Sequence, residues 1–235
     1  MSEPRRAIAL FAKAPTPGFV KTRLVPPLSA EEAADLALAF LIDSTAAMLR
    51  AAARCDAQAA LFYSPADAAP WFRSVLGERI CYYPQREGDL TERLAGAYRT
   101  LAEAGCDTVC FIGADSPTLP EGTIDAAFAG LREHDLAIGP AQDGGYYLLA
   151  MRAANVEIFS GIAWSTEHVL QQTRAAAQRL GLSVSPLPMW YDVDDESTLH
   201  QLIRELAICQ PHDDSFDARE TREYLARRRF FEKRS

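Results

Sequence analysis

Short apolar runs alternate with longer amphipathic segments along most of the chain. A continuous apolar run bounded by turn residues predicts a buried strand, and apolar residues that recur every three or four positions predict a helix. The predicted strands are Ala7–Ala12, Ala57–Tyr63, Ile80–Tyr83, Thr108–Ile112, Leu136–Gly139, Tyr146–Met151 and Ser183–Leu187. The predicted helices are a long segment opened by Ser29, then Pro65–Leu76, Leu90–Ala104, Pro120–Glu133, a segment capped by Ser165 and ending at Leu180, Asp195–Ile208 and Glu220–Phe231.

This order of strands and helices predicts one layered α/β domain with a mostly parallel sheet, over residues 1–210. The turn Asp143-Gly144-Gly145 lies between two apolar runs and indicates a hairpin, which adds at least one antiparallel strand. Ser29 with Glu32 three residues later is a capping box and marks the start of the long helix. Residues 211–235 are more polar and are expected to form a helical tail that packs on the domain or extends from it.

Composition narrows the classes of function. The chain has 235 residues and a formal net charge of −8, which argues against a general nucleic-acid binder but leaves room for a local basic patch that holds a small anion. We see no segment that approaches the ~20 apolar residues of a membrane span, and no signal-peptide pattern. We therefore expect a cytoplasmic protein without a membrane span, and its composition is compatible with a homo-oligomer.

The loop after the first strand carries the clearest candidate chemistry. It contains Lys13, Lys21 and Arg23, together with Pro17, Gly18 and Thr22. A cationic loop at the end of a first strand is typical of phosphate binding in α/β proteins, and a glycine there permits close approach of the backbone. The spacing is neither that of a Walker A loop nor G-x-G-x-x-G. The alternative is a proline-rich surface loop with scattered cations.

Acidic residues follow two later elements. Asp115 comes after the apolar strand Thr108–Ile112, at the sheet edge where α/β proteins bind ligands, and a lone carboxylate there suits Mg²⁺ or Mn²⁺. An Asx turn before Pro117 is the alternative. Asp192 or Asp194 is a candidate second metal ligand, although acidic residues are also favoured at a helix start.

Two further segments have both structural and functional interpretations. Asp143 is a candidate base or ligand, and Gly144 and Gly145 leave room for a substrate, but Asp-Gly is equally a hairpin turn. The corner Trp164-Ser165-Thr166 is most simply a helix cap, and a helix N-terminus can also bind an acceptor anion.

Six motifs in one order resemble a known family. They are Lys13-Ala-Pro-Thr-Pro-Gly-Phe-Val-Lys-Thr-Arg-Leu24, Gly88-Asp-Leu90, Gly113-Ala-Asp-Ser-Pro117, Gly139-Pro-Ala-Gln-Asp-Gly-Gly-Tyr-Tyr147, Trp164-Ser-Thr166 and Asp192-Val-Asp194. The family is the bacterial glycosyltransferase-like family called radical-SAM/selenodomain-associated transferase 1, which is more distantly similar to 2-phospho-lactate guanylyltransferase. The resemblance covers about Ala7 to Leu202.

The resemblance implies a GT-A fold, a Rossmann-like nucleotide-diphospho-sugar transferase domain, and it implies roles for particular residues. The residues implied in nucleotide binding are Lys13, Pro17, Gly18, Lys21, Thr22, Arg23, Gly88, Leu90 and Ala114, with Gly88 and Leu90 near the base. The implied metal ligands are Asp115 with Asp192 or Asp194, and the implied acceptor residues are Gly144, Gly145, Tyr146, Trp164, Ser165 and Thr166. Many glycosyltransferases carry Asp-x-Asp where this chain has Ala114-Asp115, and this departure fits a nucleotidyltransferase equally well.

Three functions remain open on the sequence. The first, favoured by the resemblance, is a Mg²⁺- or Mn²⁺-dependent glycosyltransferase that uses a nucleotide-sugar and a small-molecule acceptor. In this reaction Asp115, Lys21 and Arg23 stabilise the leaving diphosphate, and Asp143 orients or deprotonates the acceptor. The second is a nucleotidyltransferase that joins an NTP to a phosphorylated small molecule and releases pyrophosphate, since three cations suit a triphosphate. The third is a nucleotide-binding module without catalysis.

Overall fold

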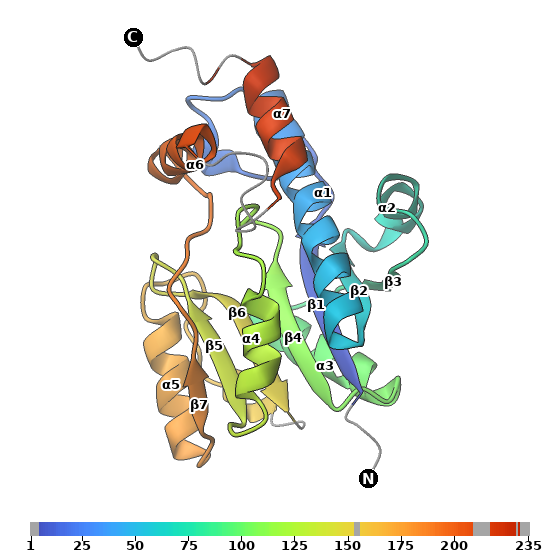
Figure 1. Cartoon of the computed structure of the whole chain (residues 1–235), viewed down its shortest axis with the longest axis vertical. Coiled ribbons are helices and arrows are strands. Elements are labelled where there is room, and N and C mark those ends of the chain that lie inside the picture. Colours follow the sequence, from blue (N-terminus) through green and yellow to red (C-terminus); the bar gives the residue numbers. More distant parts are fainter. Residues whose placement is uncertain (1–4, 153–155, 209–216, 229, 231–235) are drawn as a thin grey trace.

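A seven-stranded sheet with helices on both faces forms the centre of the molecule (Figure 1). The computed structural model describes residues 5–152, 156–208, 217–228 and 230. The strand order across the sheet is β3 (Cys81–Pro84), β2 (Ala57–Ser64), β1 (Arg6–Lys13), β4 (Thr108–Gly113), β6 (Tyr146–Arg152), β5 (Leu136–Pro140) and β7 (Val184–Pro186). Only β6 runs antiparallel to its neighbours β4 and β5. The predicted α/β fold with a mostly parallel mixed sheet is confirmed.

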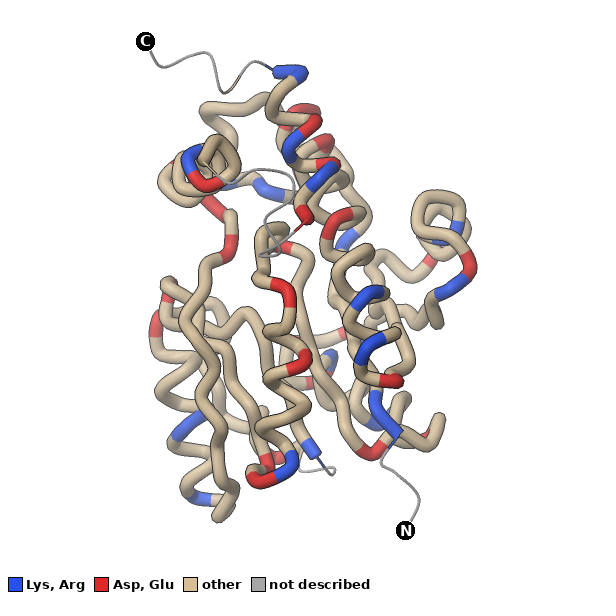
Figure 2. Tube along the Cα trace, viewed as in Figure 1, with Lys and Arg blue, Asp and Glu red and all other residues tan. Residues whose placement is uncertain are grey.

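The helices divide between the two faces and the end of the sheet. They are α1 (Ala30–Cys55), α2 (Ala69–Leu76), α3 (Leu90–Glu103), α4 (Thr123–Gly130), α5 (Val169–Arg179), α6 (Glu196–Ile208) and α7 (Arg219–Arg227), with short 3₁₀ turns η1 (Thr22–Leu24), η2 (Ala66–Ala68) and η3 (Val156–Phe159). Apolar residues of α1, α2 and α4 cover one face, and those of α3, α5 and η3 cover the other. Helices α6 and α7 lie beyond the carboxyl ends of the parallel strands (Figure 1). Lys, Arg, Asp and Glu lie mainly on helices and connecting loops (Figure 2).

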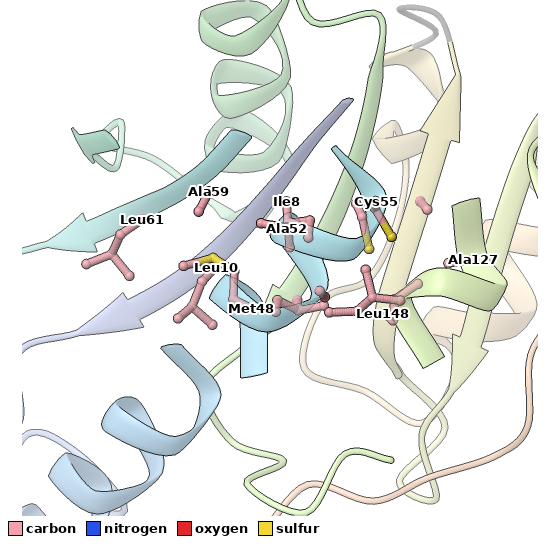
Figure 3. Close-up of a cluster of buried hydrophobic side chains, with 14 of the residues drawn as sticks. Ile8, Leu10, Met48, Ala52, Cys55, Ala59, Leu61, Ala127 and Leu148 are labelled. Carbon is pink, nitrogen blue, oxygen red and sulfur yellow. The ribbon is translucent and has the colours of Figure 1, made fainter. Parts of the chain in front are cut away.

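Strand β1 shows why a continuous apolar run indicates a strand that is covered on both faces of the sheet. Ile8 and Leu10 pack under α1, where Met48 and Ala52 cover them (Figure 3). The intervening residues of β1 face the cluster formed by α3 and α5. A strand covered on both faces has no polar alternation, so the run of apolar residues is the expected pattern.

Helix α1 is more apolar than expected. Its Ser29–Glu32 capping box is present as predicted. In the described part of the chain it is the one helix that is long and apolar enough to cross a membrane by length and composition, so the expectation that no segment approaches this limit is wrong. However, 56% of that apolar window is buried inside the molecule, which is typical of the core helix of a globular domain.

Two predicted helices begin later than expected. The prediction Pro120–Glu133 is too long, because Gly122 has φ 84° and α4 begins only after it and ends at Gly130. Ser165 does not cap α5: it has φ 63°, and the helix starts four residues on, at Val169. A residue in the left-handed conformation cannot lie inside a right-handed helix, and the apolar pattern does not reveal such residues.

A third apolar cluster joins the last two helices to the start of α1. It includes Leu36 and Phe40 of α1, Leu202 of α6 and Leu225 of α7. Helix α7 therefore packs on the domain, along α1 (Figure 1). Of the predicted tail, residues 211–216, 229 and 231–235 lie outside the described residues, including part of the predicted helix Glu220–Phe231.

A buried carboxylate fastens α7 to α1. Asp43 lies within α1 and accepts hydrogen bonds from the backbone N–H groups of Glu220, at 3.0 Å, and Thr221, at 2.8 Å. Burial raises the pKa of Asp43 to about 6, although these hydrogen bonds favour the charged form. Above this pH the carboxylate is ionised and complements the positive N-terminal end of α7.

We expect Asp43→Ala to lower the free energy of unfolding by about 1–3 kcal/mol, because two buried N–H groups lose their acceptor. Urea unfolding at pH 8 measures the change. Glu103→Ala, at an exposed position of α3, is the control and is expected to change it by less than about 0.5 kcal/mol. If the two variants unfold alike, α7 does not depend on the Asp43 contact.

Candidate functional site

A cleft of about 430 Å³ opens at the carboxyl ends of β1 and β4. Its lining residues come from the first loop, α1, the start of α3, the loop after β4 and the segment before α6. They are Phe11, Ala12, Lys13, Phe19, Val20, Lys21, Thr22, Arg23, Ala37, Leu41, Gln85, Leu90, Arg93, Ala114, Asp115 and Asp194. The structure thus gathers most of the predicted nucleotide-binding residues at the sheet edge where α/β proteins bind ligands.

Lys21 is the central charged group of this cleft. Its ammonium group forms ion pairs with Asp115 and with Asp194, the latter at 2.9 Å. It also lies 5.6 Å from the centre of the Phe40 ring. Burial by itself would lower the pKa of Lys21, but the two carboxylates outweigh it and raise that pKa. Lys21 is therefore a buried cation whose charged form is favoured by its two carboxylate partners.

The local backbone geometry brings Lys21, Asp115 and Asp194 together. Lys21 has φ 48° and precedes η1, and this turn directs its side chain back across the cleft. Asp115 follows β4 by two residues, and its carbonyl accepts a hydrogen bond from Val193 N–H at 2.9 Å. That bond ties the loop after β4 to the acidic segment before α6. This segment is visible as acidic positions between the sheet and α6 (Figure 2).

The remaining acidic residues of this segment have other partners. Asp195 caps α6 by accepting from Thr198 N–H at 3.0 Å, and it pairs with Arg23 at 3.1 Å. Asp192 accepts a hydrogen bond of 2.5 Å from Ser116 Oγ. Burial, followed by the charges of Asp115 and Asp194, raises the pKa of Asp192 to about 7, against the Ser116 hydrogen bond and Lys21.

Two cations of the cleft have no carboxylate partner among the residues that the structure describes. They are Lys13, at the end of β1, and Arg93, in the first turn of α3. The guanidinium of Arg93 donates from Nε to the carbonyl of Gly88 at 3.0 Å, and no carboxylate in the described part of the chain pairs with it. These two unneutralised charges make the cleft suitable for an anion with several charged oxygens.

Eight of the lining residues were not predicted as site residues, and three of these bring a polar group or an exposed ring to the cleft. Arg93 lies three positions after Leu90, so helical spacing from that predicted residue was a usable signal. Gln85 donates from Nε2 to the carbonyls of Ala12, at 3.1 Å, and Phe62, at 2.8 Å, and so ties the ends of β1 and β2. Phe19 is 77% exposed and lines the cleft, and its place within the motif Lys13–Leu24 was the signal that could have found it.

Comparison with known proteins places the chain in a family. Residues 46–166 match the family model described as "Uncharacterized protein conserved in bacteria (DUF2064)". The chain belongs to the DUF2064 family. A solved structure from Desulfovibrio desulfuricans G20, provisionally named as a nucleotide-diphospho-sugar transferase, is 34% identical to this DUF2064 protein, with a TM-score of 0.85 and coverage of 97% of this chain and 96% of that chain.

Other relatives of this DUF2064 protein are nucleotidyltransferases by name. A 3-phospho-D-glycerate guanylyltransferase from Phenylobacterium zucineum (strain HLK1) is 31% identical over 134 residues, which span 57% of this chain and 61% of that relative. A cytidylyltransferase structure from Leptospira borgpetersenii is 11% identical with a TM-score of 0.58, covers 99% of this chain and 98% of that chain, and shows likeness of fold alone. The predicted family resemblance and the prediction of a transferase are confirmed at this coarse level.

The predicted acceptor residues of the DUF2064 protein do not line this cleft. Those residues are Gly144, Gly145, Tyr146, Trp164, Ser165 and Thr166. Asp143 lines a separate hollow of about 50 Å³, which it shares with Gln142, Arg23 and Asp192. Because Arg23 and Asp194 line both hollows, the small one adjoins the cleft.

Each part of the acceptor segment has a structural role. Asp143 Oδ1 accepts from Gly145 N–H at 2.8 Å, which is the contact of an Asx-type turn. Trp164 Nε1 donates to Thr91 Oγ1 at 2.8 Å and so joins its corner to the start of α3. Thr166 Oγ1 donates to the Ala163 carbonyl at 2.7 Å. Pro17, Gly18 and Gly88 shape the loops around the cleft without lining it.

The donor set of the cleft fits one divalent cation held by two carboxylates. Among the described residues, no group of three or more His, Cys, Asp or Glu side chains is arranged to hold a metal, so Asp192 does not join the other two. Asp115 and Asp194 do converge, since both contact the Lys21 ammonium, which stands where a cation is favourable. Mg²⁺ and Mn²⁺ take one or two protein carboxylates and complete their coordination with phosphate oxygens and water.

Proposed function

We propose that this protein is a nucleotidyltransferase that joins a nucleoside monophosphate, taken from an NTP, to a small molecule bearing a phosphate group, with release of pyrophosphate. The observation that carries the proposal is the charge arrangement of the cleft. Lys21 is held between two carboxylates, while Lys13 and Arg93 are left without a carboxylate partner among the described residues. The guanylyltransferase relative supports the same class of reaction.

In the proposed reaction an oxygen of the acceptor phosphate attacks the α-phosphorus of the NTP. A new bond forms between them, the bond from the α-phosphorus to the bridging oxygen of the β-phosphate breaks, and pyrophosphate carries the released charge. Lys13 and Arg93 bind the phosphate chain, and Lys21 and Arg23 stabilise the charge that develops on the leaving group. The acceptor is already an anion, so the reaction needs no strong base.

We further propose Asp115 and Asp194 as the ligands of a Mg²⁺ or Mn²⁺ ion. Such an ion supplies charge neutralisation at the phosphates. Asp143 and the small hollow beside the cleft are the proposed acceptor side, because Arg23 at their border can pair with an anionic group. The corner Trp164-Ser165-Thr166 is joined to the start of α3 by the bond from Trp164 to Thr91 and does not line this hollow.

The second candidate is transfer of a sugar from a nucleotide-diphospho-sugar. The motif resemblance and the provisional name of the Desulfovibrio desulfuricans relative favour it. It uses the same cleft, the same proposed metal ligands and the same cations. The two reactions differ in the product that leaves, which is pyrophosphate in nucleotidyl transfer and a nucleoside diphosphate in sugar transfer.

An assay of the leaving group tests the proposal. The pure protein is incubated with Mg²⁺ or Mn²⁺, a panel of phosphorylated hydroxy acids and sugar phosphates, and either each NTP or each common nucleotide-sugar. We expect acceptor-dependent release of pyrophosphate from one NTP. Release of a nucleoside diphosphate from a nucleotide-sugar would instead assign sugar transfer, and nucleotide binding without turnover of either kind would assign a module without catalysis.

We expect Arg93→Ala to raise the KM for the NTP by about tenfold or more with a smaller change in kcat, since a hydrogen bond to a charged group contributes about 1.5–3 kcal/mol. Steady-state kinetics with the NTP that the leaving-group assay selects measures both constants. Arg99→Ala is the matched control, because Arg99 is exposed on the same helix and does not line the cleft. Equal KM values for both variants would remove Arg93 from the phosphate site.

A further inference from the structure

The ammonium group of Lys21 occupies the position between the two carboxylates that best suit a metal ion. It contacts Asp115 and donates a hydrogen bond of 2.9 Å to Asp194. The side chain of Lys21 is only 6% exposed, whereas those of Asp115 and Asp194 are 51% and 40% exposed. The carboxylates therefore remain open to the cleft, while the cation that pairs with both of them is inside the protein.

An ammonium group and a divalent cation cannot share this position. Lys21 contacts Oδ1 of both carboxylates, and a metal ion held by the same two groups would lie so close that its charge repels the ammonium. The pairing with Lys21 also balances one of the two negative charges that attract a metal. In the arrangement seen here, one of the two negative charges of the carboxylate pair is thus already balanced from within.

The surroundings offer Lys21 a second set of partners. Lys13, Arg23 and Arg93 line the same cleft, so a phosphate chain drawn to them lies within the space that Lys21 also lines. The backbone of Lys21 is anchored by η1, in which Leu24 is fully buried. A lysine side chain has four rotatable bonds, so its ammonium can change partners while this anchor stays in place.

We propose that Lys21 and a divalent cation are alternative occupants of the Asp115–Asp194 pair, and that a phosphate chain exchanges them by drawing the ammonium onto its own oxygens. Without a nucleotide, Lys21 keeps the metal off the carboxylates. With a nucleotide, the ammonium pairs with phosphate and the carboxylates become metal ligands. Linkage then requires that metal and nucleotide each tighten the binding of the other.

This inference rests on the proposed function for its metal and its nucleotide, but its test needs neither turnover nor an identified substrate. Mn²⁺ binding to the nucleotide-free protein is measured by electron paramagnetic resonance, at pH 8, for wild type and Lys21→Met. We expect Lys21→Met to bind one Mn²⁺ at least about tenfold more tightly than wild type, because the internal competitor is gone. Lys21→Gln is a second variant in case methionine disturbs the loop, and thermal unfolding confirms that each is folded.

Two controls separate exchange from a general effect of charge. Lys13→Met removes one positive charge from the same cleft without touching the carboxylate pair, so it is expected to bind Mn²⁺ as wild type does. In Lys21→Met combined with Asp115→Asn, the gain in affinity is expected to disappear. The inference is overturned if neither Lys21 variant gains affinity, if Lys13→Met gains as much, or if the gain survives Asp115→Asn.

Failure of the exchange between Lys21 and the metal and failure of the proposed nucleotidyl transfer give different results. If NTP turnover is observed but the Lys21 variants bind Mn²⁺ no better than wild type, the exchange is wrong and nucleotidyl transfer stands. If the Lys21 variants gain Mn²⁺ but no NTP is turned over, the exchange stands and the proposed reaction is wrong.

Discussion

Asp115→Ala is expected to lower the turnover number by about two to three orders of magnitude while the protein stays folded. The side chain of Asp115 is 51% exposed and lies in the loop after β4, outside the buried clusters. The backbone bond from Val193 N–H to its carbonyl does not involve the side chain and is retained. The variant removes a proposed metal ligand and one partner of Lys21 without opening the core.

Pyrophosphate release at saturating NTP measures this loss, and thermal unfolding checks the fold. Asp67→Asn is the matched control, because Asp67 is an exposed carboxylate of η2 outside the cleft. Turnover of Asp115→Ala within about threefold of wild type would take Asp115 out of the proposed chemistry. A loss confined to KM would instead give Asp115 a role in binding alone.

The sheet was predictable because its strands are covered on both faces. Residues such as Ile8 and Leu10 must be apolar in any such arrangement, and the turns between elements carry glycine, proline or acidic residues that mark their ends. The turn at Asp143-Gly144-Gly145 predicted an antiparallel strand, which is β6. The limits of α4 and α5 were not predictable, since they depend on left-handed residues at Gly122 and Ser165.

The candidate cleft was predictable in part for a related reason. Lys21 and Asp115 each follow a strand whose carboxyl end lies at the same edge of the sheet, so their meeting follows from the topology. The choice of Asp194 over Asp192 as the second carboxylate depends on side-chain contacts, namely the Ser116 bond to Asp192. Sequence order contains no information on that choice.

Gly144 tests how much of the predicted acceptor segment is structural. We expect Gly144→Ala to lower the free energy of unfolding by about 2–5 kcal/mol, the sum of a positive-φ cost and an overpacking cost. Gly144 has φ 89°, and a Cβ there would lie 2.7 Å from the Cα and carbonyl carbon of Glu167 and closer to its carbonyl oxygen. For a chain of this size the loss corresponds to a fall in Tm of about 5–15 °C.

The matched control separates backbone strain from crowding. Gly181 has φ 68° and nothing within 4 Å of the position of an added Cβ, so Gly181→Ala is expected to cost only about 1–2 kcal/mol. The Gly144 turn packs against the start of α5, where Leu170 N–H donates to the Gly144 carbonyl at 2.9 Å. The space beside Gly144 is therefore filled by the protein's own backbone. If Gly144→Ala were as stable as Gly181→Ala but lost acceptor binding, that space would instead belong to a substrate.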